Sequence, residues 1–281
     1  MKIALCDEGG KVYWGVADPA AGTVQPIAGT FESWAPAVTV AGSAAALTFA
    51  GDPRPLAGVR LRPPVERGRT IVAAGANYRS HVEELGLHMP ARPAAFLKPF
   101  RSIIGPTDEI RYPALTTQLD YEIELVVIVG TAESRGHTPT STDVLGYAAG
   151  NDVSARDLQF GGSVTGMDMF SSKALDDTSA IGPWIVTRDE LGDNPDLDLT
   201  LRVNDEVRQK DRTGSMVWNI DELLAFVDAR TSLGSGDLIF TGTPAGIAHA
   251  SGRYLQPGDV VETTIEGVGT LRNIVGAAPQ L

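Results

Sequence analysis

Two glutamates that lie two residues apart are the first feature of this sequence with a chemical meaning. Glu122 and Glu124 occur in the apolar run 121–129, whose β-branched residues predict a strand that ends at Gly130. Side chains two apart share one face of a strand, so the two carboxylates would project together. Such a pair resists burial unless a positive charge lies between them, and Mg²⁺ or Mn²⁺ prefers oxygen ligands of this kind. The alternative is an edge strand with both glutamates in water.

A third carboxylate follows another apolar run, residues 146–150. The run ends in a polar cluster that contains Asp152 and Asp157, and polar residues at strand ends often belong to sites. Either aspartate could be a third metal ligand, and either could instead cap a turn. The residues alone leave that choice open.

A histidine and a glutamate lie three residues apart in a short acidic segment, residues 80–87, that we expect to be helical. On a helix His81 and Glu84 are neighbours, so the carboxylate could orient the imidazole or share its proton. Such a pair can activate water as a general base if the substrate is within reach. The alternative is a solvated pair on a surface helix.

Two lysines and one loop complete the candidates. Lys98 and Lys173 could each meet an anionic substrate or could each be a surface lysine. The segment 238–246 reads as a strand that leads into a Gly/Pro loop with two hydroxyls, and loops of this kind often offer backbone N–H groups to carboxylates.

The elements that must position these residues are mainly strands, so we expect an α+β fold that is mainly β. Strand-like runs occupy residues 71–74, 121–129, 184–186, 197–203, 237–241 and 260–265, and turn signals at 203–207 and 265–269 predict hairpins. Two helices interrupt them, at residues 80–87 and 219–229; the second has apolar residues at helical spacing behind the N-cap Asn219.

The first 60 residues predict a separate, small, strand-rich domain. Four prolines and five arginines crowd residues 52–69, and prolines at that density disfavour regular hydrogen-bonded structure. We therefore place a boundary there, with a catalytic domain over residues 70–281.

Composition excludes several classes of protein. The net charge of −12 and the absence of a basic run make nucleic acid and anionic membranes poor partners. The single cysteine, Cys6, cannot form an internal disulfide, and no apolar stretch is long enough for a membrane span or a signal sequence. We expect a cytoplasmic protein in which Cys6 is a packed thiol.

Taken in order, the motifs resemble the fumarylacetoacetate hydrolase family over roughly residues 70–275. The segment from Asn77 to Glu84 is similar to the family's lid motif, Glu122 and Glu124 to its Glu-x-Glu, and residues 152–159 to its Asp-x-Ser-Ala-Arg-Asp-x-Gln. Lys173 and the Thr-Gly-Thr-Pro of residues 241–244 follow in the same order.

The resemblance implies a mixed β-roll for the C-terminal domain, and it implies roles for residues. It makes Glu122, Glu124 and Asp152 the ligands of Mg²⁺ or Mn²⁺ and leaves Asp157 a supporting role. His81 and Glu84 become the water-activating dyad and Lys173 the group that stabilises charge on the substrate. The pocket would be lined by Lys98, Arg156, Gln159 and Thr243, and a homodimer is expected.

The implied reaction is hydrolysis of a carbon–carbon bond in an acylpyruvate-like 2,4-dioxo acid, as in acylpyruvases and fumarylpyruvate hydrolases. The same site could instead decarboxylate, isomerise or hydrate a 2-oxo acid such as oxaloacetate, and a catalytically silent binding protein is a third reading. Asp205 replaces a glycine that is usual in the family, and Ala180 replaces a common proline. Residues 160–170 match the family least, and we expect them to influence the choice of substrate.

Overall fold

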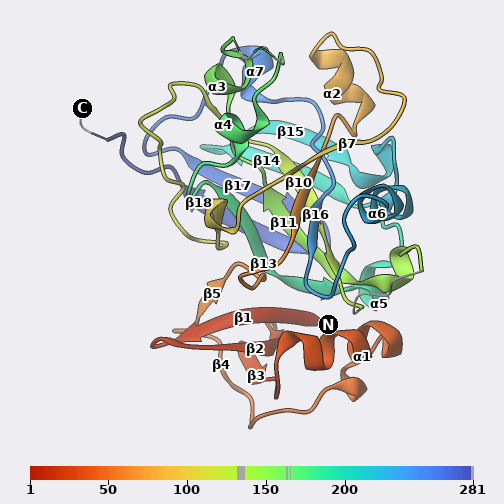
Figure 1. The fold of residues 1–281 in the computed structure, drawn as a ribbon. Coiled ribbons are helices and arrows are strands. Elements are labelled where there is room, and N and C mark those ends of the chain that lie inside the picture. Colours follow the sequence, from red (N-terminus) through yellow and green to blue (C-terminus); the bar gives the residue numbers. More distant parts are fainter. Residues whose placement is uncertain (132–136, 163, 165, 280–281) are drawn as a thin grey trace.

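The computed structural model describes residues 1–131, 137–162, 164 and 166–279 (Figure 1). The strands are β1 (Lys2–Glu8), β2 (Lys11–Asp18), β3 (Thr23–Pro26), β4 (Arg54–Pro55), β5 (Arg60–Arg62), β6 (Ile71–Gly75), β7 (Ala94–Leu97), β8 (Ile103–Ile104), β9 (Leu119–Asp120), β10 (Ile123–Val129), β11 (Val144–Asn151), β12 (Ser154–Ala155), β13 (Ser179–Thr187), β14 (Asp198–Val203), β15 (Glu206–Arg212), β16 (Leu238–Phe240), β17 (Val260–Ile265) and β18 (Gly269–Ile274). The α-helices are α1 (Phe31–Ala41), α2 (Arg79–Glu84), α3 (Arg156–Phe160), α4 (Met169–Lys173), α5 (Arg188–Leu191), α6 (Ile220–Asp228) and α7 (Ala248–Ser251). Short 3₁₀ turns cover Ala44–Ala46, Phe100–Ser102, Ser141–Asp143 and Thr213–Ser215.

Most strands join one twelve-stranded sheet in the described part of the chain. Its order is β4-β3-β2-β1-β13-β11-β10-β16-β6-β7, with β5 added beside β1 and β8 beside β13. A four-stranded antiparallel sheet, β15-β14-β17-β18, and the pair β12-β9 complete the architecture. The expected α+β, mainly β, fold class is confirmed.

The strand β10 lies at the centre of the core because both of its faces are buried. Leu125 and Val127 face the cluster that includes the four-stranded sheet, whereas Val126 and Ile128 face the cluster around α1. A strand covered on both sides reads as a continuous apolar run rather than an alternating one. The strand β10, which carries Glu124 as its second residue, is therefore held by packing on both faces.

The expected strands and hairpins are found, with shifted ends. The run 121–129 forms a strand only from Ile123, so Glu122 precedes β10 instead of sharing a face within it. The expected hairpins are β14–β15 and β17–β18. The helix expected at 219–229 is α6, and Asn219 and Glu222 form a capping box at its start. The helix expected at 80–87 is shorter: α2 ends at Glu84.

One expectation for the N-terminal part is wrong, and one α-helix in it was not expected. Residues 1–60 contain the expected strands but also the eleven-residue helix α1, which packs Phe31, Trp34 and Val38 into the core. The proline-rich segment is not devoid of regular pairing, because β4 pairs with β3 and β5 pairs with β1. Short helices besides the expected two also occur at α3, α4, α5 and α7.

The N-terminal strands continue the main sheet, because β1 pairs antiparallel with β13 through Lys2 and Ile3 (Figure 1). The division into domains at residues 60–70 stays a prediction. Cys6 is fully buried in β1, and burial raises the pKa of its thiol to about 12. No helix within the described ranges is long and apolar enough to span a membrane.

Candidate active site

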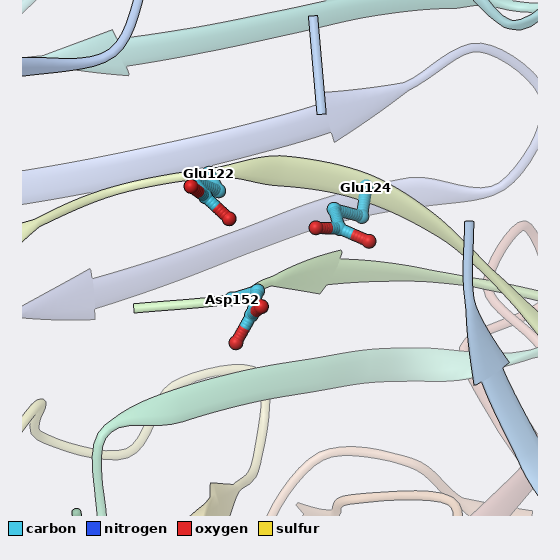
Figure 2. Close-up of side chains that lie close together, drawn as sticks. All are labelled: Glu122, Glu124 and Asp152. Carbon is cyan, nitrogen blue, oxygen red and sulfur yellow. The ribbon is translucent and has the colours of Figure 1, made fainter. Parts of the chain in front are cut away.

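Three buried carboxylates lie close together where β10 begins and β11 ends. Glu124 is the second residue of β10, Glu122 directly precedes that strand, and Asp152 directly follows β11. The antiparallel register places Ile123 opposite Asn151, so the three side chains lie at the same edge (Figure 2). Each offers an oxygen within 4.8 Å of the others, and each is between 1% and 5% exposed.

Three cations surround the carboxylates, but they are distributed unevenly. The Lys173 Nζ lies 2.5 Å from Oε2 of Glu122 and 2.8 Å from Oδ2 of Asp152. The Lys98 Nζ lies 2.6 Å from the other Asp152 oxygen, and Arg156 pairs with Glu122. Glu124 has no ion pair with a cation of the described chain and accepts only the N–H of Gly242, at 2.6 Å.

The pKa values follow this distribution. Burial alone would raise the pKa of Glu122, but Lys173 and Arg156 lower it to about 2. Burial, together with Asp152 and Glu122, raises the pKa of Glu124 well above its ordinary value. Burial lowers the pKa of Lys98, whereas Asp152 and Glu122 outweigh burial and raise that of Lys173. Lys173 is therefore charged at neutral pH.

The donor set fits a hard divalent cation. All three side chains offer carboxylate oxygens, the ligand type of Mg²⁺ and Mn²⁺. Glu124 is a buried carboxylate that makes no ion pair with a described cation, and such a group is costly unless a cation compensates it. A dication between the three side chains would supply the missing charge.

The predicted pair His81 and Glu84 is brought together on α2. The His81 Nδ1 lies 3.6 Å from Oε2 of Glu84, too far for a hydrogen bond, and neither atom has another partner among the described residues. The other oxygen of Glu84 accepts the N–H of Gly246 at 2.8 Å. His81 is 6% exposed and lies on the wall of the cavity that also contains the three carboxylates.

The loop after β16 donates backbone N–H groups to carboxylates, as its composition predicts. The carboxylates that it binds belong to the protein itself, namely Glu124 and Glu84. Gly242 holds Glu124 and Gly246 holds Glu84. Both glycines have positive φ, and a Cβ at Gly246 would lie 2.1 Å from the carbonyl oxygen of Arg208. A side chain at either position would displace the loop.

A cavity of about 600 Å³ contains most of the predicted pocket residues. The Thr243 hydroxyl accepts a hydrogen bond from Gln209 at 2.9 Å, which leaves its own hydrogen for a ligand. Lys98 does not reach the wall; it lies behind Asp152 and also donates to the carbonyl oxygen of Lys173 at 2.8 Å. The predicted residues on the wall are His81, Glu122, Glu124, Asp152, Arg156, Gln159, Lys173 and Thr243.

Asp157 lies apart from the carboxylate cluster. It accepts hydrogen bonds from the hydroxyl of Thr116 and, at 2.9 Å, from the N–H of Thr117. Its role is to fix the loop before β9. Of the two aspartates that the sequence left open, the structure therefore brings only Asp152 to the glutamates.

Two further site residues were missed from the sequence. His249, on α7, lies on the cavity wall. Asp120 is completely buried and accepts from Nε of Arg156 at 2.8 Å and from the N–H groups of Ala248 and His249. Asp120 lies directly before the apolar run that contains Glu122 and Glu124, and this position could have indicated it. Nothing in the sequence marked His249.

Comparisons with known proteins place this geometry in a family. Residues 70–276 match the C-terminal domain of fumarylacetoacetate (FAA) hydrolase. The chain is 38% identical to a 2,4-didehydro-3-deoxy-L-rhamnonate hydrolase of a Sphingomonas species over 77% of this chain and 76% of that protein. It is 34% identical to a mitochondrial oxaloacetate tautomerase of Rattus norvegicus over 79% of this chain and 71% of that protein.

A solved structure with a bound metal ion is also similar. It is fumarylpyruvate hydrolase from Pseudomonas aeruginosa in complex with Mn²⁺ and pyruvate, with a TM-score of 0.67 and 29% identity over 77% of this chain and 91% of that one. The family match, the identities and the shared fold agree with the motif order in the sequence. The chain belongs to the fumarylacetoacetate hydrolase family.

Proposed function

We propose that this protein is a divalent-metal-dependent hydrolase that cleaves a carbon–carbon bond in an acylpyruvate-like 2,4-dioxo acid. The observation that carries the proposal is one cavity that combines three buried carboxylates with His81, whose Nδ1 lies 3.6 Å from Oε2 of Glu84. The relatives named as hydrolases support it, since one of them is 38% identical over most of both chains.

Glu122, Glu124 and Asp152 would hold the metal. When bound, Mg²⁺ or Mn²⁺ supplies Lewis-acid polarisation of the 2-oxo acid end of the substrate. Lys173 fixes the orientation of two of these ligands through its contacts with Glu122 and Asp152. Lys98 orients Asp152 from behind in the same way.

The His81–Glu84 pair would generate the nucleophile. A water molecule beside His81 loses a proton to the imidazole, and Glu84 stabilises the resulting positive charge. The hydroxide equivalent adds to the distal carbonyl carbon of the substrate. The gap of 3.6 Å between Nδ1 and Oε2 would shorten when substrate binds, since catalytic hydrogen bonds are often long in free enzymes.

The leaving group would be the enolate of pyruvate. As the tetrahedral intermediate collapses, the bond between the acyl carbon and the neighbouring methylene carbon breaks, and its electron pair becomes the enolate. The charged Lys173 Nζ offsets that negative charge, and the Thr243 hydroxyl is free to donate to the same end. His81 returns the proton to the enolate carbon, which yields pyruvate and a carboxylic acid.

The test is to incubate the metal-stripped protein, with and without Mg²⁺ or Mn²⁺, with a panel of acylpyruvates and with oxaloacetate. Mass spectrometry identifies the products. Pyruvate and a free carboxylic acid that form only with metal are expected. No cleavage of any dioxo acid by fully metal-loaded protein would contradict the proposal.

A second candidate is favoured by the tautomerase relative, which is 34% identical over 79% of this chain. In that reaction the same pair would move a proton within a 2-oxo acid rather than activate water. The oxaloacetate arm of the panel detects it, as interconversion of keto and enol forms without cleavage, and would equally detect decarboxylation as release of carbon dioxide.

The cytoplasmic location expected from the sequence stays a prediction.

A further inference from the structure

The side chains that line the cavity differ in polarity and exposure between its floor and its mouth. At the floor, the three carboxylates are between 1% and 5% exposed. At the mouth, the side chains are apolar and much more accessible: Leu87 is 49% exposed, Met167 46% and Phe160 39%. Leu85, Phe96 and Met169, which are half-buried, add further apolar wall.

The lysine and arginine side chains on this wall, among the described residues, already pair with carboxylates of the protein. Arg156 donates through Nε to Asp120 at 2.8 Å and through Nη1 to Gln159 at 2.8 Å, and its third nitrogen pairs with Glu122. Lys173 is bound between Glu122 and Asp152. Among the described residues that line the cavity, these two are the lysine and arginine side chains, so that lining leaves no unpaired lysine or arginine for a second anionic group.

His249 does not supply a charge at the mouth either. Its ring stacks on Phe160, with 4.8 Å between the ring centres and 28° between the planes, and its Nδ1 lies 3.2 Å from the Tyr254 hydroxyl. Burial and the nearby Arg156 lower the pKa of His249, so the imidazole is neutral at neutral pH. It therefore extends a flat, uncharged surface formed with Phe160.

We propose that the acyl end of the substrate is an uncharged hydrocarbon group rather than a second carboxylate. This inference rests on the proposed function, because it takes the 2-oxo acid end to bind at the carboxylate floor. A hydrocarbon tail would gain about 25 cal/mol for each Å² of apolar surface it buries against these side chains. A carboxylate at the same place would lose part of its hydration against these apolar side chains without an ion pair to the lining residues in return.

The test compares two 2-oxo acids of similar length that the enzyme cannot cleave. Isothermal titration calorimetry with Mn²⁺-loaded protein measures the Kd of 2-oxoheptanoate, which ends in a hydrocarbon chain, and of 2-oxoadipate, which ends in a carboxylate. We expect 2-oxoheptanoate to bind about tenfold or more tightly, the consequence of a carboxylate left without a partner. Equal or tighter binding of 2-oxoadipate would overturn the proposal.

A charge variant tests whether the tail of the substrate lies at the mouth of the cavity. Leu87→Lys should tighten the binding of 2-oxoadipate several-fold relative to 2-oxoheptanoate, because it puts a cation on the half-exposed rim. Val40→Lys is the matched control: it adds the same charge at an 84% exposed site on α1, which is not part of this cavity. If Leu87→Lys changes the ratio of the two affinities no more than Val40→Lys does, the tail does not lie at this mouth and the proposal is wrong.

The binding assay separates this inference from the proposed reaction. If 2-oxoheptanoate binds more tightly while no dioxo acid is cleaved, the hydrolase assignment fails and the preference for an uncharged tail holds. If acylpyruvates are cleaved but succinylpyruvate is cleaved as efficiently as pentanoylpyruvate, the hydrolase assignment holds and the tail inference fails.

Discussion

At the scale of single residues, the carboxylate cluster owes its function to unequal pairing. Glu122 and Asp152 each touch a lysine, whereas Glu124 accepts, within the described part of the chain, only a backbone N–H group. The sequence indicated the glutamates through their spacing, but it could not show which oxygens the lysines would hold. That information depends on contacts of the ends of β10 and β11 with α4, which carries Lys173, and with the residue after β7, Lys98, and these segments are distant in sequence.

The first prediction at this scale concerns a ligand. Glu122→Gln keeps the shape of the side chain but removes one of the three carboxylates, so metal-dependent turnover should fall by at least about 100-fold. Circular dichroism and the melting temperature in the absence of metal report whether the fold is kept. Glu109→Gln, at an exposed position away from the site, is the control and should retain activity. Full activity of Glu122→Gln would refute the ligand assignment.

The second prediction concerns the dyad. His81→Ala should leave Mn²⁺ affinity unchanged, because His81 is not one of the three clustered carboxylates, and should lower kcat by about 10²- to 10⁴-fold, as loss of a general base does. Calorimetry measures the metal affinity and a steady-state assay the rate. Turnover near the wild-type rate with bound metal would show that water is activated elsewhere.

At the scale of elements, local patterns were informative where packing agreed with them. The capping box of α6 and the two hairpins follow from short-range signals. The helix α1 was missed although Phe31, Trp34, Ala35 and Val38 have helical spacing; the helix continues through Pro36, a residue that disfavours a helix interior. The early end of α2 also has a local signal that the sequence prediction did not use: Gly86, at a φ of 64°, follows the C-cap Leu85, and the N–H groups of Gly86 and Leu87 donate back to the carbonyl oxygens of Glu83 and Val82.

The β14–β15 hairpin allows a test of turn chemistry. Its two-residue loop has positive φ at both Asn204 (50°) and Asp205 (67°), the conformation of a type I′ turn, which favours glycine at the second position. Asp205→Gly should therefore stabilise the protein by about 0.5 kcal/mol, and Asp205→Ala should destabilise it. Urea unfolding measures both. An Asp205→Gly protein no more stable than the Asp205→Ala protein would contradict this explanation of the turn.

At the scale of the whole molecule, several large apolar side chains remain in water. Phe170 is 81% exposed, Leu115 70% and Leu97 68%, and exposed apolar surface often marks an interface. The homodimer expected from the family resemblance would have a mass of about 59 kDa, twice the 29.6 kDa of the chain. Light scattering coupled to size-exclusion chromatography measures it, and a mass near 30 kDa at micromolar concentration would exclude a stable dimer.

Metal binding should stabilise the whole fold, and the effect should depend on pH. The raised pKa of Glu124 stabilises the metal-free fold at low pH, and that contribution is lost as pH rises through the folded-state value. The cation requires the ionised form, so a proton competes with it at low pH. Mn²⁺ at one fixed concentration, about 100 times its Kd at pH 8, should raise Tm by about 5 to 10 °C at pH 8 and by less at pH 5.5, where its Kd is higher. Differential scanning calorimetry measures both values. The control is Glu124→Gln, which has no proton to displace at this position, so its increment in Tm should be small and nearly independent of pH. An equal increment in Tm at both pH values in the wild type would show that Glu124 does not carry the linkage.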